Sequence, residues 1–353
     1  MKRRLLRIAA MKRPLLRIAA ALCAAQLLAA SGIAGDDPAD GAARAATAAD
    51  TAAGTAAKAE SASAGQPTAV QAQKVRHPEH APLLAAARAG GRLVVVGDFG
   101  TILLSDDDGK GWRQAQSVPT RATLTAVEFV DERHGWAVGH GGVILSTDDG
   151  GEHWSLRHEA GSDVALFSVH FGDLRRGLVV GSFGFASRTD DGGATWHRVQ
   201  LGDQDVHLYQ IFSDSRGATW IAAEMGTVYR SDDGERFERV EVPYSGSLWG
   251  GMATPDGSIL LWGMGGTLLR SPDGGRSWRP TSTDTQNPIT AGCRLPDGRL
   301  VFVGLGGTVL ASSDGGATVS TEIRPTRHAY TAAILARGKP LLFSLAGVEP
   351  PQP

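Results

Sequence analysis

From about residue 82 onward, apolar and polar positions alternate in the pattern of short β-strands. Runs such as Val94–Val96 and Leu300–Val303 are each followed by a glycine-bounded turn and a second short apolar run. Alternation of this kind, interrupted by glycine, is typical of strands joined in hairpins. A further strand is expected upstream of each pair, as at Leu124–Val130 and Leu208–Phe212. The sequence therefore predicts a repeating unit of four strands.

Each unit ends in a turn motif of the form Ser/Thr-x-Asp-x-Gly-x-x-Trp, known as an Asp box. Four copies fit it and two are degenerate: Ser105–Trp112, Thr147–Trp154, Thr189–Trp196, Ser271–Trp278, Ser231–Phe237 and Ser312–Val319. Their last residues lie 41 or 42 positions apart. Four strands repeated at this period are the signature of a β-propeller blade.

The residue types in the box favour a structural role. A short Asp side chain can accept backbone N–H bonds within its own turn, glycine supplies a positive φ, and an aromatic ring packs against the blade. We therefore interpret the box residues as turn locks rather than as metal ligands or catalytic groups. They are Ser105, Asp107, Gly109, Trp112, Asp149, Gly151, Trp154, Asp191, Gly193, Trp196, Asp233, Asp273, Gly275, Trp278, Asp314 and Gly316.

Two strands remain after the sixth box, at Ala329–Leu335 and Pro340–Ser344, and they make half a blade. Because an exposed sheet edge is a liability, we expect residues around Thr68–Arg76 to pair with this half-blade. The predicted fold class is thus all-β: a seven-bladed β-propeller of four-stranded antiparallel blades, with the ring closed by an N-terminal strand.

The N-terminal part of the chain has a different composition. Residues 1–34 read as a signal peptide, with a basic start, an apolar Ala/Leu run and small residues after it. Met1–Ala10 and Met11–Ala20 are near copies, so either methionine is a candidate start. Residues 35–75 form an Ala-rich spacer with few large apolar groups, and such a segment is expected to be disordered. We expect an exported, periplasmic or extracytoplasmic propeller over 76–353, with an uncleaved signal anchor as the alternative.

Charge and cysteine content exclude several classes. The formal charge is −2, and it becomes −9 without the seven basic residues that precede the first apolar run. An acidic domain does not suit nonspecific nucleic-acid binding. Beyond the leader, Cys293 stands alone, which excludes an internal disulfide or a cysteine-based zinc site. No phosphate loop or dinucleotide fingerprint is present, so we expect no cofactor and no metal.

The boxes and the Val-Gly-x-x-Gly lead-in before them resemble the propeller family of the photosystem II assembly and stability factors, over roughly Pro82–Val348. The resemblance implies a non-catalytic scaffold for a protein partner, either a membrane complex under assembly, as in photosynthesis, or a transporter of the resistance-nodulation-division type. We expect a monomer.

Asp boxes also occur in sialidases and other carbohydrate-active proteins, so the box alone does not assign a function. The Phe/Tyr-Arg-Ile-Pro element of sialidases is not found. A carbohydrate-active enzyme or glycan-binding protein stays as the alternative, because Trp220, Trp249 and Trp262 lie outside the boxes and are of the type that stacks on sugars.

Blade topology divides the turns between two faces. Turns between the second and third strands lie with the interblade connections, opposite the Asp boxes. These turns display Phe99, His140, Phe183, Met225 and Met264, which suit an adaptable apolar binding surface. The alternative is that they tuck between the blades.

The interblade connections align just ahead of each innermost strand. Arg121 and Arg327 occupy equivalent positions in these connections, on either side of the first blade, and His328 follows Arg327. They are candidates for a basic spot that recognises an acidic segment or a terminal carboxylate of a partner. The alternative is that they are solvated or pair with Asp163 and Asp205.

Overall fold

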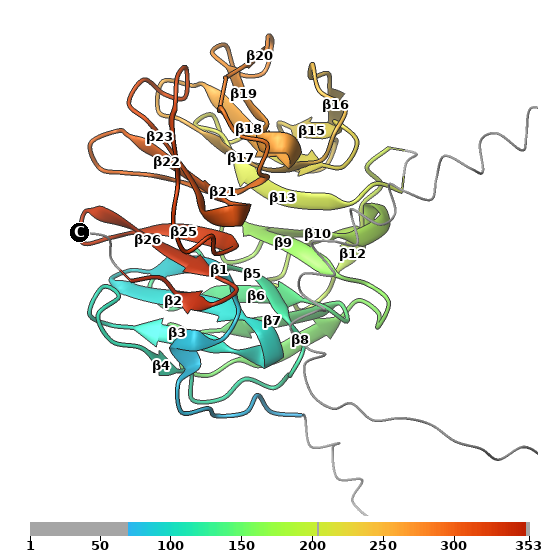
Figure 1. The fold of residues 1–353 in the computed structure, drawn as a ribbon. Helices are drawn as coiled ribbons and strands as arrows, with labels where there is room; N and C mark the ends of the chain where they lie inside the picture. Colours follow the sequence, from blue (N-terminus) through green and yellow to red (C-terminus); the bar gives the residue numbers. More distant parts are fainter. Residues whose placement is uncertain (1–69, 203–204, 351–353) are drawn as a thin grey trace, which may run out of the picture. The chain divides into compact units, whose positions relative to one another are not determined.

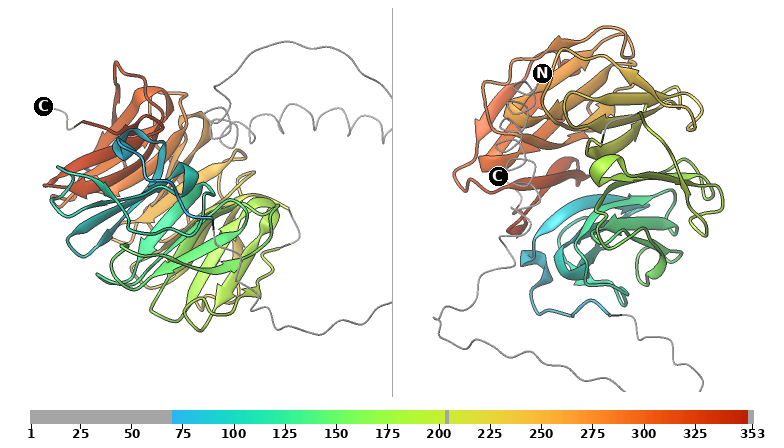
Figure 2. Two further views of the ribbon diagram at one scale, coloured as in Figure 1. Left: turned by 90° about the horizontal axis from the view of Figure 1, so that it is seen from below. Right: turned by 90° about the vertical axis from the view of Figure 1, so that its right-hand side faces the viewer.

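The computed structural model describes residues 70–202 and 205–350, and it confirms a seven-bladed, all-β propeller. Seven antiparallel sheets surround a common axis, and the first strand of each sheet is innermost (Figures 1 and 2). The innermost strands contact one another in sequence around the ring, and the last contacts the first. Only single turns of 3-10 helix occur between strands in the described part of the chain.

The first three blades follow the chain without a crossover. Blade 1 consists of β1 (Leu83–Ala89), β2 (Arg92–Gly97), β3 (Ile102–Ser105) and β4 (Arg113–Gln114). Blade 2 consists of β5 (Leu124–Phe129), β6 (Gly135–Gly139), β7 (Val143–Thr147) and β8 (Ser155–Glu159). Blade 3 consists of β9 (Leu166–Phe171), β10 (Gly177–Gly181), β11 (Ala186–Thr189) and β12 (His197–Arg198).

The same order continues to the end of the ring. Blade 4 consists of β13 (Leu208–Ser213), β14 (Thr219–Ala223), β15 (Val228–Ser231) and β16 (Glu238–Val240). Blade 5 consists of β17 (Leu248–Ala253), β18 (Ile259–Gly263), β19 (Leu268–Ser271) and β20 (Arg279–Pro280). Blade 6 consists of β21 (Ile289–Arg294), β22 (Leu300–Gly304), β23 (Thr308–Ser312) and β24 (Ser320–Ile323). Blade 7 consists of β25 (Tyr330–Ala336), β26 (Lys339–Ser344) and β27 (Gly347–Val348).

The hydrophobic core lies between neighbouring blades. Val94 and Leu104 of blade 1 pack with Leu124, Leu145 and Trp154 of blade 2, and equivalent clusters fill the other junctions. The Trp154 ring meets Phe129 edge-on, with 6.0 Å between ring centroids. Since every blade buries both faces of its middle strands, these strands are apolar along nearly their whole length and do not alternate, as in Val94–Val96 and Leu300–Val303.

Each Asp box is a closed set of hydrogen bonds. In blade 3, the Thr189 hydroxyl donates to Asp191 Oδ1 at 2.7 Å and accepts the Gly193 N–H at 2.9 Å. Asp191 also accepts the backbone N–H and the hydroxyl of Thr195, at 2.8 and 2.6 Å. The other five boxes repeat the Ser/Thr-to-Asp bond. These carboxylates therefore hold their own turns.

The predicted closure by an N-terminal strand is wrong. Blade 7 has three strands among the described residues, and its third strand is the C-terminal β27, not a segment from 68–76. Ala72 instead donates to Val118 O at 2.9 Å, beside blade 1. The chain after β26 reaches the blade edge through a short turn, and closing so short a loop costs less entropy than recruiting a distant segment.

One N-terminal element still covers blade 7. The turn η2 (Pro78–His80) packs on β27, and a Cβ on Gly347 would lie 2.0 Å from the Glu79 carbonyl oxygen. Gly347 also has φ of 108°, so glycine is required there. The expected leader at 1–34 and nearly all of the spacer at 35–75 lie outside the described residues. Within them, no helix is long and apolar enough to cross a membrane.

Candidate partner-binding face

One face of the ring carries the turns that follow the second strand of blades 1–6, together with the interblade connections; we call it the turn face. In blades 1–4 and 6, a backbone hydrogen bond ties this turn to the connection that leads to the next blade. Gly100 N donates to Ala122 O at 3.0 Å, Gly142 N to Val164 O at 2.8 Å, and Gly184 N to Val206 O at 2.8 Å. The turns are therefore held at fixed positions around the central axis.

Three of these turns place a large apolar side chain in a left-handed backbone conformation. Phe99, Phe183 and Met225 have φ of 55°, 52° and 58°, and they are 60%, 65% and 62% exposed. The equivalent turns of blades 2, 5 and 6 carry glycine there, at Gly141, Gly265 and Gly306. A left-handed residue with a Cβ costs about 1–2 kcal/mol relative to glycine. Folding alone does not require large apolar residues at these positions.

The other two predicted display residues are partly buried. His140 and Met264 precede the left-handed position of their turns, and both are less exposed than Phe99, Phe183 and Met225. Burial lowers the pKa of His140, although the charge of Asp98 acts in the opposite direction. No described residue is hydrogen-bonded to His140 Nε2. Of the five residues, Phe99, Phe183 and Met225 form the exposed part of the surface.

The predicted basic residues lie on the turn face, but no described contact joins them. Arg121 is exposed, and its Nε donates to the Gln71 carbonyl at 3.0 Å. Arg327 is exposed, has φ of 54°, and forms no ion pair with a described residue. His328 Nδ1 lies 2.8 Å from Oε1 of the buried Glu349. The two arginines are thus available to a partner, whereas His328 is held by its own blade.

An aromatic cluster that the sequence reasoning missed lies beside Phe183. His207 accepts the Phe183 N–H at its Nδ1, 3.1 Å away, and the two rings are 4.8 Å apart. Phe167 and Tyr209 stack 5.9 Å apart and both lie near the His207 ring. We call Phe167, Phe183, His207 and Tyr209 the aromatic cluster. It is built from blades 3 and 4.

The innermost strands of the seven blades surround a central channel, and aromatic side chains gather on one part of its wall. The second residue of each innermost strand lines a cavity of about 340 Å³. Three consecutive blades contribute aromatic rings there, namely Phe167, Tyr209 and Trp249, while blades 2, 6 and 7 contribute Thr125, Thr290 and Thr331. The contrast between aromatic residues and threonines is visible when the repeats are aligned, but only once it is known which residue of each innermost strand faces the channel. Trp220 and Trp262, the other candidates for sugar stacking, are buried, although Trp262 also borders this cavity.

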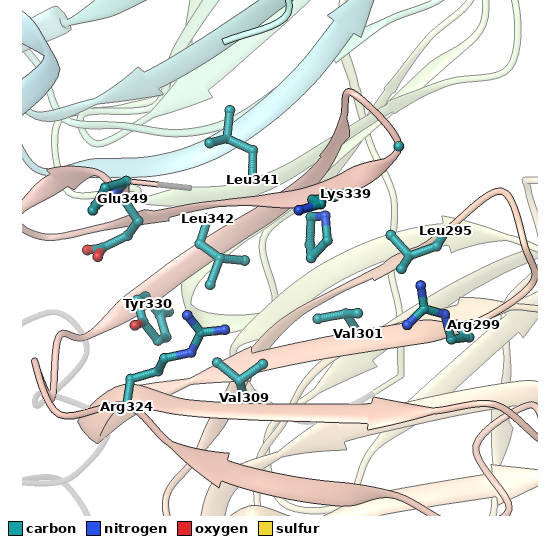
Figure 3. Close-up of a pocket in the computed structure, with 13 residues that line it drawn as sticks. Leu295, Arg299, Val301, Val309, Arg324, Tyr330, Lys339, Leu341, Leu342 and Glu349 are labelled. Atoms are coloured by element: carbon teal, nitrogen blue, oxygen red, sulfur yellow. The ribbon is translucent and has the colours of Figure 1, made fainter. Parts of the chain in front are cut away.

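A second cavity, of about 300 Å³, lies between blades 6 and 7. Figure 3 shows Val301 and Val309 of blade 6 near Leu342 of blade 7, with Arg324 and Tyr330 beside them. Arg324 is already paired with Glu322, 3.1 Å away. This cavity is a junction between two blades, and it is separate from the aromatic cluster.

Sequence comparison finds a family match over part of the chain. A model of the family described as photosynthesis system II assembly factor YCF48 matches residues 114–258. No curated protein sequence matches.

Solved structures share the fold at low identity. A structure of YCF48 bound to D1 peptide is 19% identical with a TM-score of 0.64, and the match covers 76% of this chain and 92% of that one. YCF48 from Cyanidioschyzon merolae is 16% identical with a TM-score of 0.61, over 79% and 97% of the two chains. A streptogramin B lyase is 13% identical with a TM-score of 0.67, over 76% and 93%. The chain is thus a propeller with Asp-box repeats that resembles the photosystem II assembly factor YCF48 family.

Proposed function

We propose that this chain is an exported scaffold that binds an extended segment of a protein partner on its turn face. The observation that carries the proposal is the set of exposed apolar residues at Phe99, Phe183 and Met225, in a conformation that the same fold elsewhere gives to glycine. A large apolar residue that is exposed and that lowers the stability of the fold through a left-handed backbone is best explained by a role in binding.

The chemistry of the face describes the partner segment. Apolar or aromatic side chains of the segment pack on the aromatic cluster and Met225, and a carboxylate of the segment pairs with Arg121 or Arg327. The ring of backbone hydrogen bonds holds these groups in place before binding, which limits the entropy lost on association. A related propeller with bound D1 peptide supports a peptide as the ligand class.

The biological partner we propose is a membrane complex under assembly, or a transporter, met outside the cytoplasm. Support comes from the family match, which names a photosystem II assembly factor, and from the signal-like leader. A glycan is the alternative ligand, and the aromatic side chains of the channel, including Trp249, favour it over other small molecules.

The test uses the full chain as bait against detergent-solubilised membranes, with a D1-derived peptide and a panel of glycans as direct binding probes. Phe183→Gly/Met225→Gly and Arg121→Ala/Arg327→Ala are expected to lose the captured complex and the peptide. Leu174→Ala is the matched control, because Leu174 is 48% exposed but lies on the Asp-box face. Equal capture by all variants contradicts the proposal, and binding to glycans alone replaces it with the alternative.

A further inference from the structure

Three polar side chains meet at the opposite end of the central channel from the aromatic cluster. His170 of β9 places its Nδ1 2.9 Å from Glu128 Oε1 of β5. Its Nε2 lies 2.7 Å from the hydroxyl of Ser213, the last residue of β13. A carboxylate, an imidazole and a serine hydroxyl are thus linked in series across blades 2, 3 and 4.

The carboxylate at the start of this series is oriented by the backbone. Glu128 Oε2 accepts the N–H of Phe171 at 2.9 Å, so its Oε1 is directed at His170. With Nδ1–H donated to Glu128, His170 Nε2 is the free base position facing the hydroxyl. This is the division of roles found in serine hydrolases, whose triads are recognised by geometry on unrelated folds and not by sequence order.

Ser213 also departs from the packing of its neighbours. The equivalent residues of blades 2 and 3 are Phe129 and Phe171, and their rings cover Gly135 and Gly177 on the adjacent strand. In blade 4 the pair is Ser213 and Thr219, and Ser213 is exposed. The substitution opens the end of the strand to solvent next to His170.

Access and protonation both suit a base. The side chains of His170 and Glu128 are 22% and 27% exposed, and Glu128 lines the channel cavity. Burial lowers the pKa of His170, but the hydrogen bond and charge of Glu128 outweigh it, and the net shift is upward from 6.5.

We propose that Ser213, His170 and Glu128 form an acyl-transfer site on the Asp-box face, with activated carboxylic esters as its substrate class. The Ser213 hydroxyl attacks the ester carbonyl carbon and passes its proton to His170 Nε2. The carbon–oxygen bond of the ester then breaks, and the proton moves to the departing alcohol. Water attacks the acyl-serine in the second half, again through His170, and releases the acid and the free serine. Glu128 acts as the positioning residue.

The substrate class follows from the hydrogen bond that occupies the backbone N–H next to Ser213. The backbone N–H of Asp214, directly after the nucleophile, donates to Ala218 O at 2.9 Å. Among the described residues it is therefore not available to stabilise an oxyanion, and such stabilisation is a large part of the rate in hydrolases. The site should react with activated esters and fluorophosphonates, and not with peptide bonds.

A fluorophosphonate probe tests the nucleophile directly. Attack by Ser213 forms a phosphorus–oxygen bond and expels fluoride, and peptide mass spectrometry locates the adduct. We expect labelling at Ser213 in the full chain, with a rate about 100-fold lower in His170→Gln. Ser215→Ala is the matched control because Ser215 is exposed two residues away. It should label as the wild type does.

Hydrolysis of 4-nitrophenyl acetate gives a second readout, expected to fall to background in Ser213→Ala and to shift its pH profile in Glu128→Gln. Labelling of Ser213 no faster than of Ser215, or unaffected by His170→Gln, overturns the proposal. Ser213→Ala should retain peptide capture on the turn face, so failure of this site is distinguishable from failure of the proposed scaffold and from misfolding.

Discussion

The hydroxyl of Thr331 in blade 7 donates to the Leu83 carbonyl oxygen of blade 1 at 2.6 Å, across the junction where the ring closes. Thr290 makes the same bond to Tyr330 O, at 2.8 Å, between blades 6 and 7. The closing junction thus uses the same contact as an internal one. Arg88 adds bonds from Nη2 and Nε to Leu335 O, at 2.7 and 3.2 Å, and an ion pair with Asp108.

Arg88→Met should weaken this closure. The substitution keeps an apolar stem but removes the bonds to Leu335 O and the pairing with Asp108, and hydrogen bonds from a charged group contribute about 1.5–3 kcal/mol. We expect a loss of about 2 kcal/mol in the free energy of unfolding, measured by urea denaturation. Arg279→Met, at an exposed arginine of β20 without a described ion pair, should leave it within about 0.5 kcal/mol. Equal effects would contradict closure through Arg88.

Phe183→Gly should stabilise the fold while removing a binding residue. It relieves a left-handed backbone but adds chain entropy to the unfolded state and gives up the contact with His207, so we expect a net gain of about 0.5 kcal/mol. Thermal unfolding measures the change. Leu174→Gly, at an exposed residue without a positive φ, should be destabilising instead. A destabilised Phe183→Gly would mean that the side chain serves packing.

Trp154→Ala should cost about 3–5 kcal/mol, because the ring is 4% exposed, packs on Phe129 and donates to Gly151 O. Trp249→Ala, in the wall of the channel, should cost clearly less. Denaturant midpoints compare the two variants. A larger loss at Trp249 would argue against the box tryptophan as the anchor of its blade.

Stability should fall in acid through the Asp boxes. Backbone and side-chain hydrogen bonds lower the pKa of Asp233 and Asp314 from 3.8 to about 2, and that of Asp191 also falls below 3.8. A depressed native pKa stabilises the fold above the unfolded value and loses this effect as pH falls through the native value. Urea midpoints should therefore decline from about pH 4 toward pH 2. Asp233→Asn/Asp314→Asn should show a shallower decline than the wild type.

The pKa of His170 should depend on Glu128. In the wild type the native pKa lies above 6.5, so this pair stabilises the fold below that value and the effect is lost as pH rises through the native pKa. Glu128→Gln removes the carboxylate charge while burial remains, so the His170 pKa should fall relative to the wild type. NMR titration of the imidazole protons measures both. An unchanged pKa would show that the two side chains are not coupled in solution.

The sequence by itself determined the blade. Short apolar runs, the glycines that bound them and the box at every 41 or 42 residues define four strands and their turn locks, because these signals act within one repeat. The six boxes and the two strands after the last box also predicted seven blades, although the strand expected to complete the seventh blade was the wrong one. The positions of Phe99, Phe183 and Met225 on one face followed from blade topology alone, whereas their exposure did not.

Tertiary structure decided everything that depends on contacts between blades. The structure completed blade 7 with β27 in place of an N-terminal strand, and it partly buried His140 at the junction between two blades. It also brought together Glu128, His170 and Ser213, which lie about 40 positions apart in sequence. In a propeller, corresponding residues of adjacent blades become neighbours only once the sheets pack around the axis. No local pattern marks them, because each residue alone is an ordinary member of its own strand.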